Sequence, residues 1–107
     1  MQNYTEKKIL GIDCYVNSEL AEAMAADKMT NYFVECEIEA LRKEIDPNDI
    51  NFETGEFKTE TGFIKVFGQV MRFSIEGEVA FDSKDEEGNP ESWHLNEEVR
   101  LQIRRVR

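Results

Sequence analysis

Residues 71–81 read MRFSIEGEVAF and carry the clearest pattern in the chain. Every second position is apolar or glycine, and the positions between them are mostly polar: Met71, Phe73, Ile75, Gly77, Val79 and Phe81 alternate with Arg72, Ser74, Glu76, Glu78 and Ala80. A period of two predicts a β-strand with one face on a core and the other in solvent. The glycine leaves two alternatives, one strand bent at Gly77 or a hairpin turned at Glu76-Gly77.

The segments before this stretch also predict strands. Residues 50–62, INFETGEFKTETG, indicate a small hairpin in which Ile50 and Phe52 pair with Phe57 across a Thr-Gly turn. Residues 63–70, FIKVFGQV, predict a strand that is apolar on both faces, with a bulge at its glycine, Gly68.

The segments after it are a polar loop and a final strand. Residues 82–96, DSKDEEGNPESWHLN, contain few apolar side chains and predict a loop. The closing stretch 97–107, EEVRLQIRRVR, alternates again and places Val99, Leu101 and Ile103 inward. We therefore expect this stretch to be an integral strand.

The N-terminal part of the chain predicts one strand and one helix. In residues 7–17, KKILGIDCYVN, the face formed by Leu10, Ile12, Cys14 and Val16 alternates with Gly11, Asp13 and Tyr15, which indicates a half-buried strand. Ser18 is a suitable N-cap for a helix over about 19–29, because good helix formers follow it. The acidic residues Glu19 and Glu22 near the start of this helix interact favourably with the positive end of its dipole. Leu20, Met24 and Met29 would face inward.

Residues 32–40 fit two structures. A strand would place Val34, Cys36, Ile38 and Ala40 on one face and Glu35, Glu37 and Glu39 on the other. A helix would align Val34, Ile38, Leu41 and Ile45. We favour the strand, because one helix running through to residue 45 would be long for so small a domain.

Together these elements predict one α+β domain over 1–107. Pro47 and its neighbours in DPND, 46–49, favour a turn. Short strands separated by turns, with one helix near the N-terminus, predict an antiparallel sheet of about four to six strands that packs one face on that helix. At 107 residues the chain is long enough to bury its own core.

Charge is distributed unevenly along the chain. The net charge is −10, yet residues 99–107 carry four arginines and no acid, while residues 1–98 carry a net −14. If the final strand neighbours 71–81, its Arg100 and Arg104 can pair with Glu76 and Glu78 across the sheet. We therefore interpret the arginines as internal partners of the protein's own acids and expect no direct binding of nucleic acid.

Glu35, Glu37 and Glu39 are the candidate partner-binding residues. As a strand they would repeat at about 6.6 to 7 Å, close to the phosphate spacing along one nucleic-acid strand. The function expected from this face is binding of a basic protein, and a sharper form is a nucleic-acid mimic such as phage use against a host defence protein.

Other classes of site find little support in the sequence. The acidic loops do not match a calcium-binding loop, and no glycine-rich phosphate motif occurs. Cys14 and Cys36 lack a CxxC pair, so we expect reduced core thiols, and the single histidine, His94, makes a zinc site with them improbable. We expect no metal, no cofactor and no catalytic site.

The sequence also predicts a location and an alternative function. The apolar runs are too short for a membrane span or a secretory signal, so we expect a cytoplasmic protein without membrane contact. The alternative to an interaction domain is a structural subunit that forms a homo-oligomer or virion part through edge strands, and a small enzyme ranks last.

Overall fold

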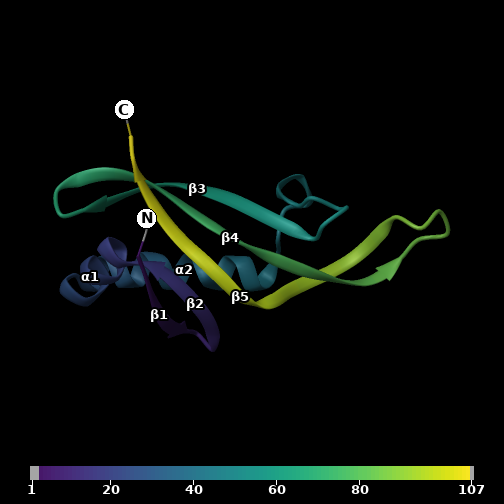
Figure 1. Cartoon of the computed structure of the whole chain (residues 1–107), viewed down its shortest axis with the longest axis horizontal. Coiled ribbons are helices and arrows are strands. Elements are labelled where there is room, and N and C mark those ends of the chain that lie inside the picture. Colours follow the sequence, from purple (N-terminus) through teal and green to yellow (C-terminus); the bar gives the residue numbers. More distant parts are fainter. Residues whose placement is uncertain (1–2, 107) are drawn as a thin grey trace.

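The computed structural model describes residues 3–106, except for the side chain of Glu97. Five strands and two α-helices form an α+β fold (Figure 1). In chain order the elements are β1 (Tyr4–Ile9), β2 (Ile12–Asn17), α1 (Ser18–Ala26), α2 (Lys28–Lys43), a 3-10 turn (Pro47–Asp49), β3 (Glu56–Val66), β4 (Gln69–Lys84) and β5 (Pro90–Arg105).

The sheet has the strand order β1-β2-β5-β4-β3 and is mixed. Adjacent strands of the sheet run antiparallel, except for β2 and β5, which run parallel. In that parallel pair Cys14 lies beside Val99 and Val16 beside Leu101. The prediction of a purely antiparallel sheet is therefore wrong. After β2 the chain crosses the sheet through the helices, and the β3–β4–β5 meander then returns β5 to the edge of β2 in the same direction.

Two consecutive helices occupy residues 18–43, where the sequence predicted one. Asn17, rather than Ser18, caps α1, since its side chain accepts hydrogen bonds from the amides of Glu19 and Leu20. Asp27 has extended backbone angles that end α1, and its carboxylate accepts from the Met29 amide and so caps α2. This break leaves Met29 exposed and not inward as predicted.

The strand predicted over 32–40 is wrong, because this segment lies inside α2. Its buried side chains Val34, Ile38 and Leu41, followed by Ile45, are those of the helical alternative. The helix forms because this stripe covers the sheet, where Phe33 also packs edge-on against Phe73 at 5.5 Å between ring centroids.

Both tight hairpins turn at a residue pair ending in glycine. The strand predicted over 7–17 is split by a turn at Leu10-Gly11 into β1 and β2, so Leu10 is not on the inner face with Cys14. Likewise Gly68 lies in the turn between β3 and β4, and the bulge of β3 is between Glu60 and Gly62 instead. In both turns the two central residues have positive φ, which favours glycine at the second position.

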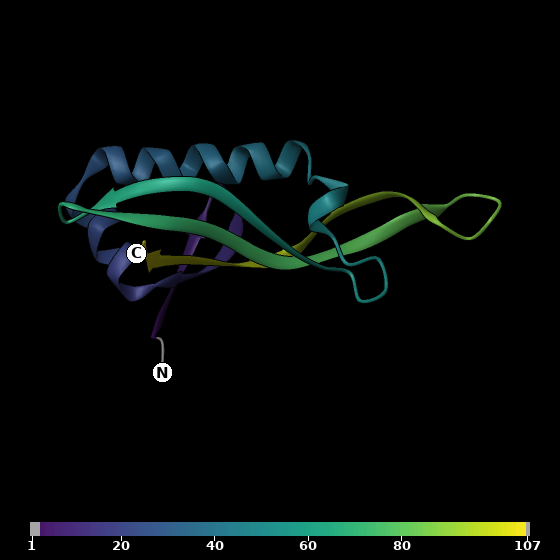
Figure 2. The same cartoon turned by 90° about the horizontal axis from the view of Figure 1, so that it is seen from above.

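The core lies between the helices and one face of the sheet. Figure 2 shows α2 running along that face, and the buried side chains come from both layers. The most deeply buried include Phe73, Ile75, Leu101, Val16, Leu20 and Ile38. The opposite sheet face is not covered by any element of residues 3–106 (Figure 1).

β4 is a single strand, so the bent alternative for 71–81 is correct. A register shift follows Gly77, and beyond it β4 and β5 continue as a two-stranded ribbon that projects past the end of α2 (Figure 2). The predicted loop over 82–96 is thus mostly strand, with the turn confined to the segment around Gly88. We call residues 78–98 the acidic arm, because they contain eight acidic residues and one lysine.

An aromatic cluster holds the base of the arm. Phe52 packs against Phe81 and Trp93 at ring-centroid distances of 6.0 and 5.5 Å, and Trp93 Nε1 donates to the carbonyl oxygen of Ile45. The pairing of Ile50 and Phe52 with Phe57 in the hairpin predicted over 50–62 is reduced to one bridge between Ile50 and Phe57. Phe52 points to the arm and not to Phe57.

Candidate functional site

The three predicted partner-binding residues do not share one face, because Glu37 lies on another side of α2 from Glu35 and Glu39. Successive residues of a helix turn by about 100°, so Glu35 and Glu37 point to nearly opposite sides of α2. Glu35 accepts a hydrogen bond from Asn31 Nδ2 at 3.0 Å, and Glu39 lies 3.9 Å from Arg42. Glu37 is half-buried beside Thr61, where burial raises its pKa and the Thr61 hydroxyl partly offsets that shift.

The surface with the most organised chemistry is the uncovered side of the sheet. We call the side of β3, β4 and β5 that points away from the helices the open face. Arg100 lies opposite Glu76 in the register of β4 and β5, and its guanidinium is 3.3 Å from the carboxylate of Glu76. The predicted cross-strand pairing of arginine and glutamate is thus confirmed at this position.

The pairing extends across a third strand. Lys58 on β3 approaches Glu76 at 3.6 Å from the other side. Glu60, also on β3, accepts from Arg104 at 2.8 Å and from Arg72 at 3.3 Å. Arg100 and Arg104 therefore pair with the protein's own acids, as predicted, although the sequence could not show that β3 supplies one of these acids. Arg107 lies outside the described residues.

One end of the open face combines basic and aromatic side chains. Arg72 lies over the ring of Phe63 at 5.6 Å from its centroid, and Phe63 keeps 57% of its surface exposed. We call Phe63, Lys65, Arg72 and Arg104 the basic end. The sequence did not predict it, since Phe63 and Arg104 come to the same end of the sheet only because both pair in register with Arg72.

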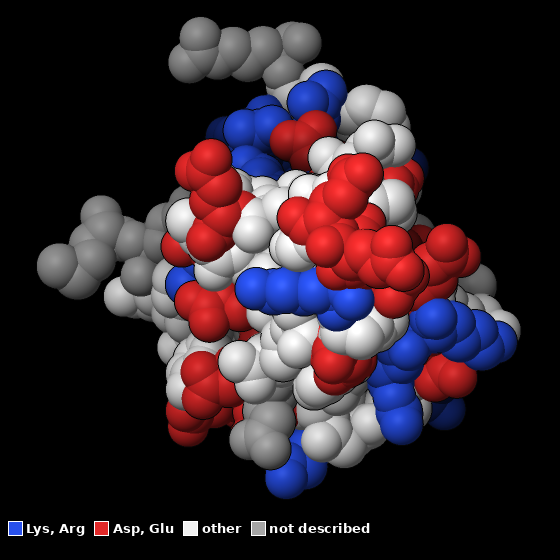
Figure 3. All heavy atoms as spheres, turned by 90° about the vertical axis from the view of Figure 1, so that its right-hand side faces the viewer, with Lys and Arg blue, Asp and Glu red and all other residues white. Residues whose placement is uncertain are grey.

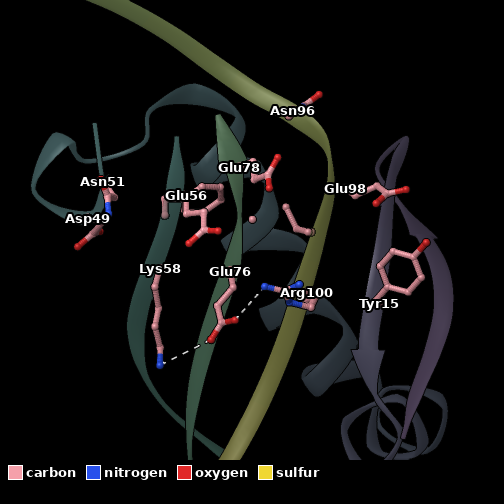
Figure 4. Close-up of a pocket in the computed structure, with 13 residues that line it drawn as sticks. Tyr15, Asp49, Asn51, Glu56, Lys58, Glu76, Glu78, Asn96, Glu98 and Arg100 are labelled. Carbon is pink, nitrogen blue, oxygen red and sulfur yellow. Dashed lines mark hydrogen bonds and ion pairs between the residues drawn. The ribbon is translucent and has the colours of Figure 1, made fainter. Parts of the chain in front are cut away.

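Toward the arm, the open face becomes an acidic hollow. It encloses about 700 Å³ between the loop around Asp49 and Asn51 and the β2 residue Tyr15 (Figure 4). We define the acidic hollow by the glutamates of its floor, one from each of three adjacent strands: Glu56, Glu78 and Glu98.

The carboxylates of the acidic hollow are poorly neutralised. Glu56 and Glu78 lie directly opposite each other in the register of β3 and β4. Within residues 3–106 no ion pair reaches Glu56, Glu78 or Glu98, because Lys58 and Arg100 both turn to Glu76 (Figure 4). Like charges directly across a sheet are destabilising, so this arrangement costs stability unless a cation approaches.

The acidic surroundings of the hollow raise the pKa of Tyr15, which lies at its wall. A hydrogen bond with Glu6 raises the pKa of its hydroxyl, and the negative charge of Glu98 raises it further. The hydroxyl therefore stays protonated and neutral through the physiological range.

The negative field continues into the arm. Figure 3, which looks at the arm end of the molecule, shows acidic side chains gathered there. Lys84, Asp85, Glu86, Glu87 and Glu91 surround a shallow depression at the tip. The protein thus carries its basic end and its acidic arm at opposite ends of one sheet.

The two cysteines differ in their surroundings. Cys14 is buried and Cys36 is exposed, and both are free, so the prediction of two core thiols is wrong for Cys36. Among the side chains of residues 3–106 that the structure describes, which leave out Glu97, no group of three or more His, Cys, Asp or Glu is placed to hold a metal ion. Nor does any helix there have the length and apolar character needed to cross a membrane.

Comparisons with known proteins assign no family to this chain. Neither the family models, nor the curated proteins, nor the solved structures contain a match to it. The class that the structure itself defines is an α+β domain with a mixed five-stranded sheet, helices on one face and a charged open face.

Proposed function

We propose that this protein is a non-enzymatic interaction domain that receives a basic protein surface on the acidic hollow of its open face. The observation that supports this most is the set of unneutralised carboxylates on adjacent strands, Glu56, Glu78 and Glu98. Natural sheets avoid like charges directly opposite each other, and a lysine or arginine from a partner would remove this repulsion.

The electrostatics of the molecule favour the same class of partner. The acidic arm carries a net −7 and the whole chain −10, so a basic protein would be attracted over the range of the Debye length, about 8 Å at 0.15 M salt. Complementary charge of this kind mainly accelerates association and selects among partners.

The nucleic-acid mimic is a narrower form of this proposal. Its original basis, a row formed by Glu35, Glu37 and Glu39, does not exist on a helix. A mimic would have to use the acidic arm, and its partner would be a nucleic-acid-binding protein whose site duplex DNA also occupies. Competition by DNA for the bound partner distinguishes this form from a plain interaction domain.

The structural subunit built through edge strands has weaker support. The edge strands are β1 and β3, and both carry features that hinder edge pairing. β1 is short and contains Glu6, Lys7 and Lys8, while β3 is interrupted by its bulge near Gly62. Charges and bulges of this kind protect edges from adding another strand.

The proposal is tested with a lysine- and arginine-rich peptide as the probe. We expect Glu56→Gln with Glu78→Gln and Glu98→Gln to weaken peptide binding by about tenfold, about 1.4 kcal/mol, in titration calorimetry at about 0.15 M salt. The matched control removes three exposed helix-layer acids: Glu19→Gln, Glu22→Gln and Glu44→Gln. Equal losses in both variants would show that the peptide responds only to net charge and would reject the acidic hollow as the site.

A further inference from the structure

The open face carries a charge pattern that is complementary to itself. Its basic end holds Arg72 and Arg104, its acidic hollow holds Glu78 and Glu98, and these residues lie on the same two strands, β4 and β5. We propose that the surface received by the acidic hollow is the basic end of a second copy of this chain, so that two open faces pack in an antiparallel dimer. This inference rests on the proposed function and names its partner.

The strand register provides the geometric argument. Thr59, Ile75 and Leu101 are paired side by side on β3, β4 and β5, so they form one row across the sheet. A two-fold axis that lies between two facing sheets along this row reverses the strand direction and keeps the strand order. Each residue on a strand then faces the residue equally far beyond the axis in the second copy.

This operation brings opposite charges together on both strands. Arg72 is three residues before Ile75 and Glu78 three residues after it, so Arg72 faces Glu78 of the second copy. On β5, Arg104 and Glu98 lie three residues on either side of Leu101, so Arg104 faces Glu98 of the second copy. Symmetry repeats both contacts, which yields four arginine–glutamate pairs.

The positions next to the axis are also compatible. Lys58 and Glu60 lie on either side of Thr59, so Lys58 of each copy faces Glu60 of the other copy. Ser74 faces Glu76, and Gln102 faces Arg100, each in the second copy. No like-charged pair arises among these residues.

The size of the contact indicates a weak dimer. The rows from Arg72 to Glu78 are about 20 Å long, and five strands about 4.8 Å apart are about 19 Å wide. The area of this contact is less than the roughly 800 Å² per partner of a stable interface. We therefore expect a reversible association that depends on protein concentration. Net charge −10 opposes it at long range, but about 0.15 M salt screens that repulsion more than it screens contacting pairs.

Charge exchange between the two ends provides the test. Arg72→Glu with Arg104→Glu makes both ends of the open face acidic, and Glu78→Arg with Glu98→Arg makes both ends basic. By sedimentation equilibrium at about 0.15 M salt, we expect wild type to dimerise and each variant to bind itself at least about tenfold more weakly. An equimolar mixture of the two variants should form the dimer again, because each end then faces the opposite charge.

Controls separate this effect from net charge and from misfolding. Glu22→Arg with Glu44→Arg changes the net charge as Glu78→Arg with Glu98→Arg does, but on exposed positions of the helix layer, and should dimerise as wild type does. If a double variant does not fold by circular dichroism, the single changes Arg104→Glu and Glu98→Arg repeat the exchange with one contact.

The outcomes distinguish this inference from the proposed function. Wild type that stays monomeric at every soluble concentration, or a dimer that survives both double variants, overturns the self-association. If peptide binding to the acidic hollow still depends on Glu56, Glu78 and Glu98, the interaction domain stands with a different partner. If the mixed variants dimerise but the peptide does not bind, the dimer stands and the binding of a foreign basic protein is rejected.

Discussion

Gly77 lies at the base of the acidic arm, directly before the shift in register between β4 and β5. A Cβ placed on it would lie 3.0 Å from the ring of Phe57 and 3.0 Å from the carbonyl oxygen of Glu98. A side chain at this position would therefore require the Phe57 ring or the backbone of β5 to shift by a few tenths of an ångström. Glycine is favoured here by this close approach and not by a need for positive φ, since Gly77 is absent from the residues with such angles.

We expect Gly77→Ala to destabilise the fold. The added methyl group must displace either an aromatic ring or a backbone carbonyl, which typically costs about 1 to 3 kcal/mol. Urea denaturation measures the loss, and Gln69→Ala at an exposed position of β4 is the control. An unchanged free energy of unfolding would mean that the backbone here adjusts freely.

The two thiols should differ in reactivity. Burial raises the pKa of Cys14 from its ordinary value of 9.0 to about 11, so almost no reactive thiolate forms at pH 8, while Cys36 is exposed. We expect iodoacetamide to add once to the native protein and twice in urea, as counted by mass spectrometry. Modification of Cys14 in the native state at the rate of Cys36 would contradict the buried position of β2.

The same pKa shift predicts a pH dependence of stability. The folded state holds the proton of Cys14 more tightly than the unfolded state does. Its contribution is therefore constant below pH 9 and is lost as the pH rises from 9 to about 11. Cys14→Ser lacks this contribution and should show a smaller loss of melting temperature over that interval.

At the scale of elements, α2 shows how the neighbours of a segment decide its structure. Residues 32–40 have the alternation of a strand and the spacing of a helix, and the sheet selects the helix because Val34, Ile38 and Leu41 form one stripe against it. The strand was favoured because one helix running through to residue 45 would be long for so small a domain. The chain avoids such a long helix because α1 ends at Ala26 and α2 begins anew at Lys28 and runs along the sheet's long direction (Figure 2).

β5 is the element on which the rest of the sheet depends. It lies between β2 and β4, and Val99, Leu101 and Ile103 are buried. Burial of such side chains contributes roughly 1.5 to 3 kcal/mol each, and a small domain has a net stability of only about 5 to 15 kcal/mol.

Deletion of residues 99–107 should therefore leave no native fold. We expect loss of dispersion in a proton–nitrogen correlation spectrum and loss of a cooperative thermal transition. The control is Arg104→Gln with Arg105→Gln, which removes two exposed charges from the same segment. This variant should keep the cooperative thermal transition. A truncated protein that melts as the full chain does would contradict the central place of β5.

At the scale of the whole molecule, charge is separated along the 51 Å axis. The acidic arm holds a net −7, and Figure 3 shows its acidic side chains at one end of the molecule. Arg72 and Arg104 pair across β4 and β5 toward the other end of the sheet. The arm rests on few apolar contacts, chiefly those of Phe81 and Trp93. Repulsion among its carboxylates should therefore limit the stability of the arm more than that of the sheet.

Salt should relieve this repulsion. We expect protection of arm amides from hydrogen exchange to rise between about 0.01 and 0.15 M salt, as the Debye length falls from about 30 to 8 Å. Amides of the central rows around Ile75 and Leu101 serve as the internal control and should change less. If arm protection falls with salt instead, cross-strand attractions in the arm outweigh its net charge.

The sequence alone determined much of the sheet and little of its surface. The alternation in 71–81 and 97–107 was sufficient to predict two strands and their inner residues, because a period of two depends only on local geometry. The arginine–glutamate pairing expected if the two strands were neighbours is confirmed for Arg100 and Glu76, whereas Arg104 pairs with Glu60 on β3. The sequence could not place β2 beside β5, since a parallel contact joins segments more than 80 residues apart and leaves no local pattern.

The candidate site was decided by tertiary structure. Glu56, Glu78 and Glu98 share a surface only through the registers of three strands, and Phe63 meets Arg72 only across the β3–β4 hairpin. By contrast, Glu35, Glu37 and Glu39 were selected from their spacing, which marks one face only if the backbone is extended. The core stripe of α2 made that backbone helical, because the gain from burying Val34, Ile38 and Leu41 depends on a sheet that the local sequence does not contain.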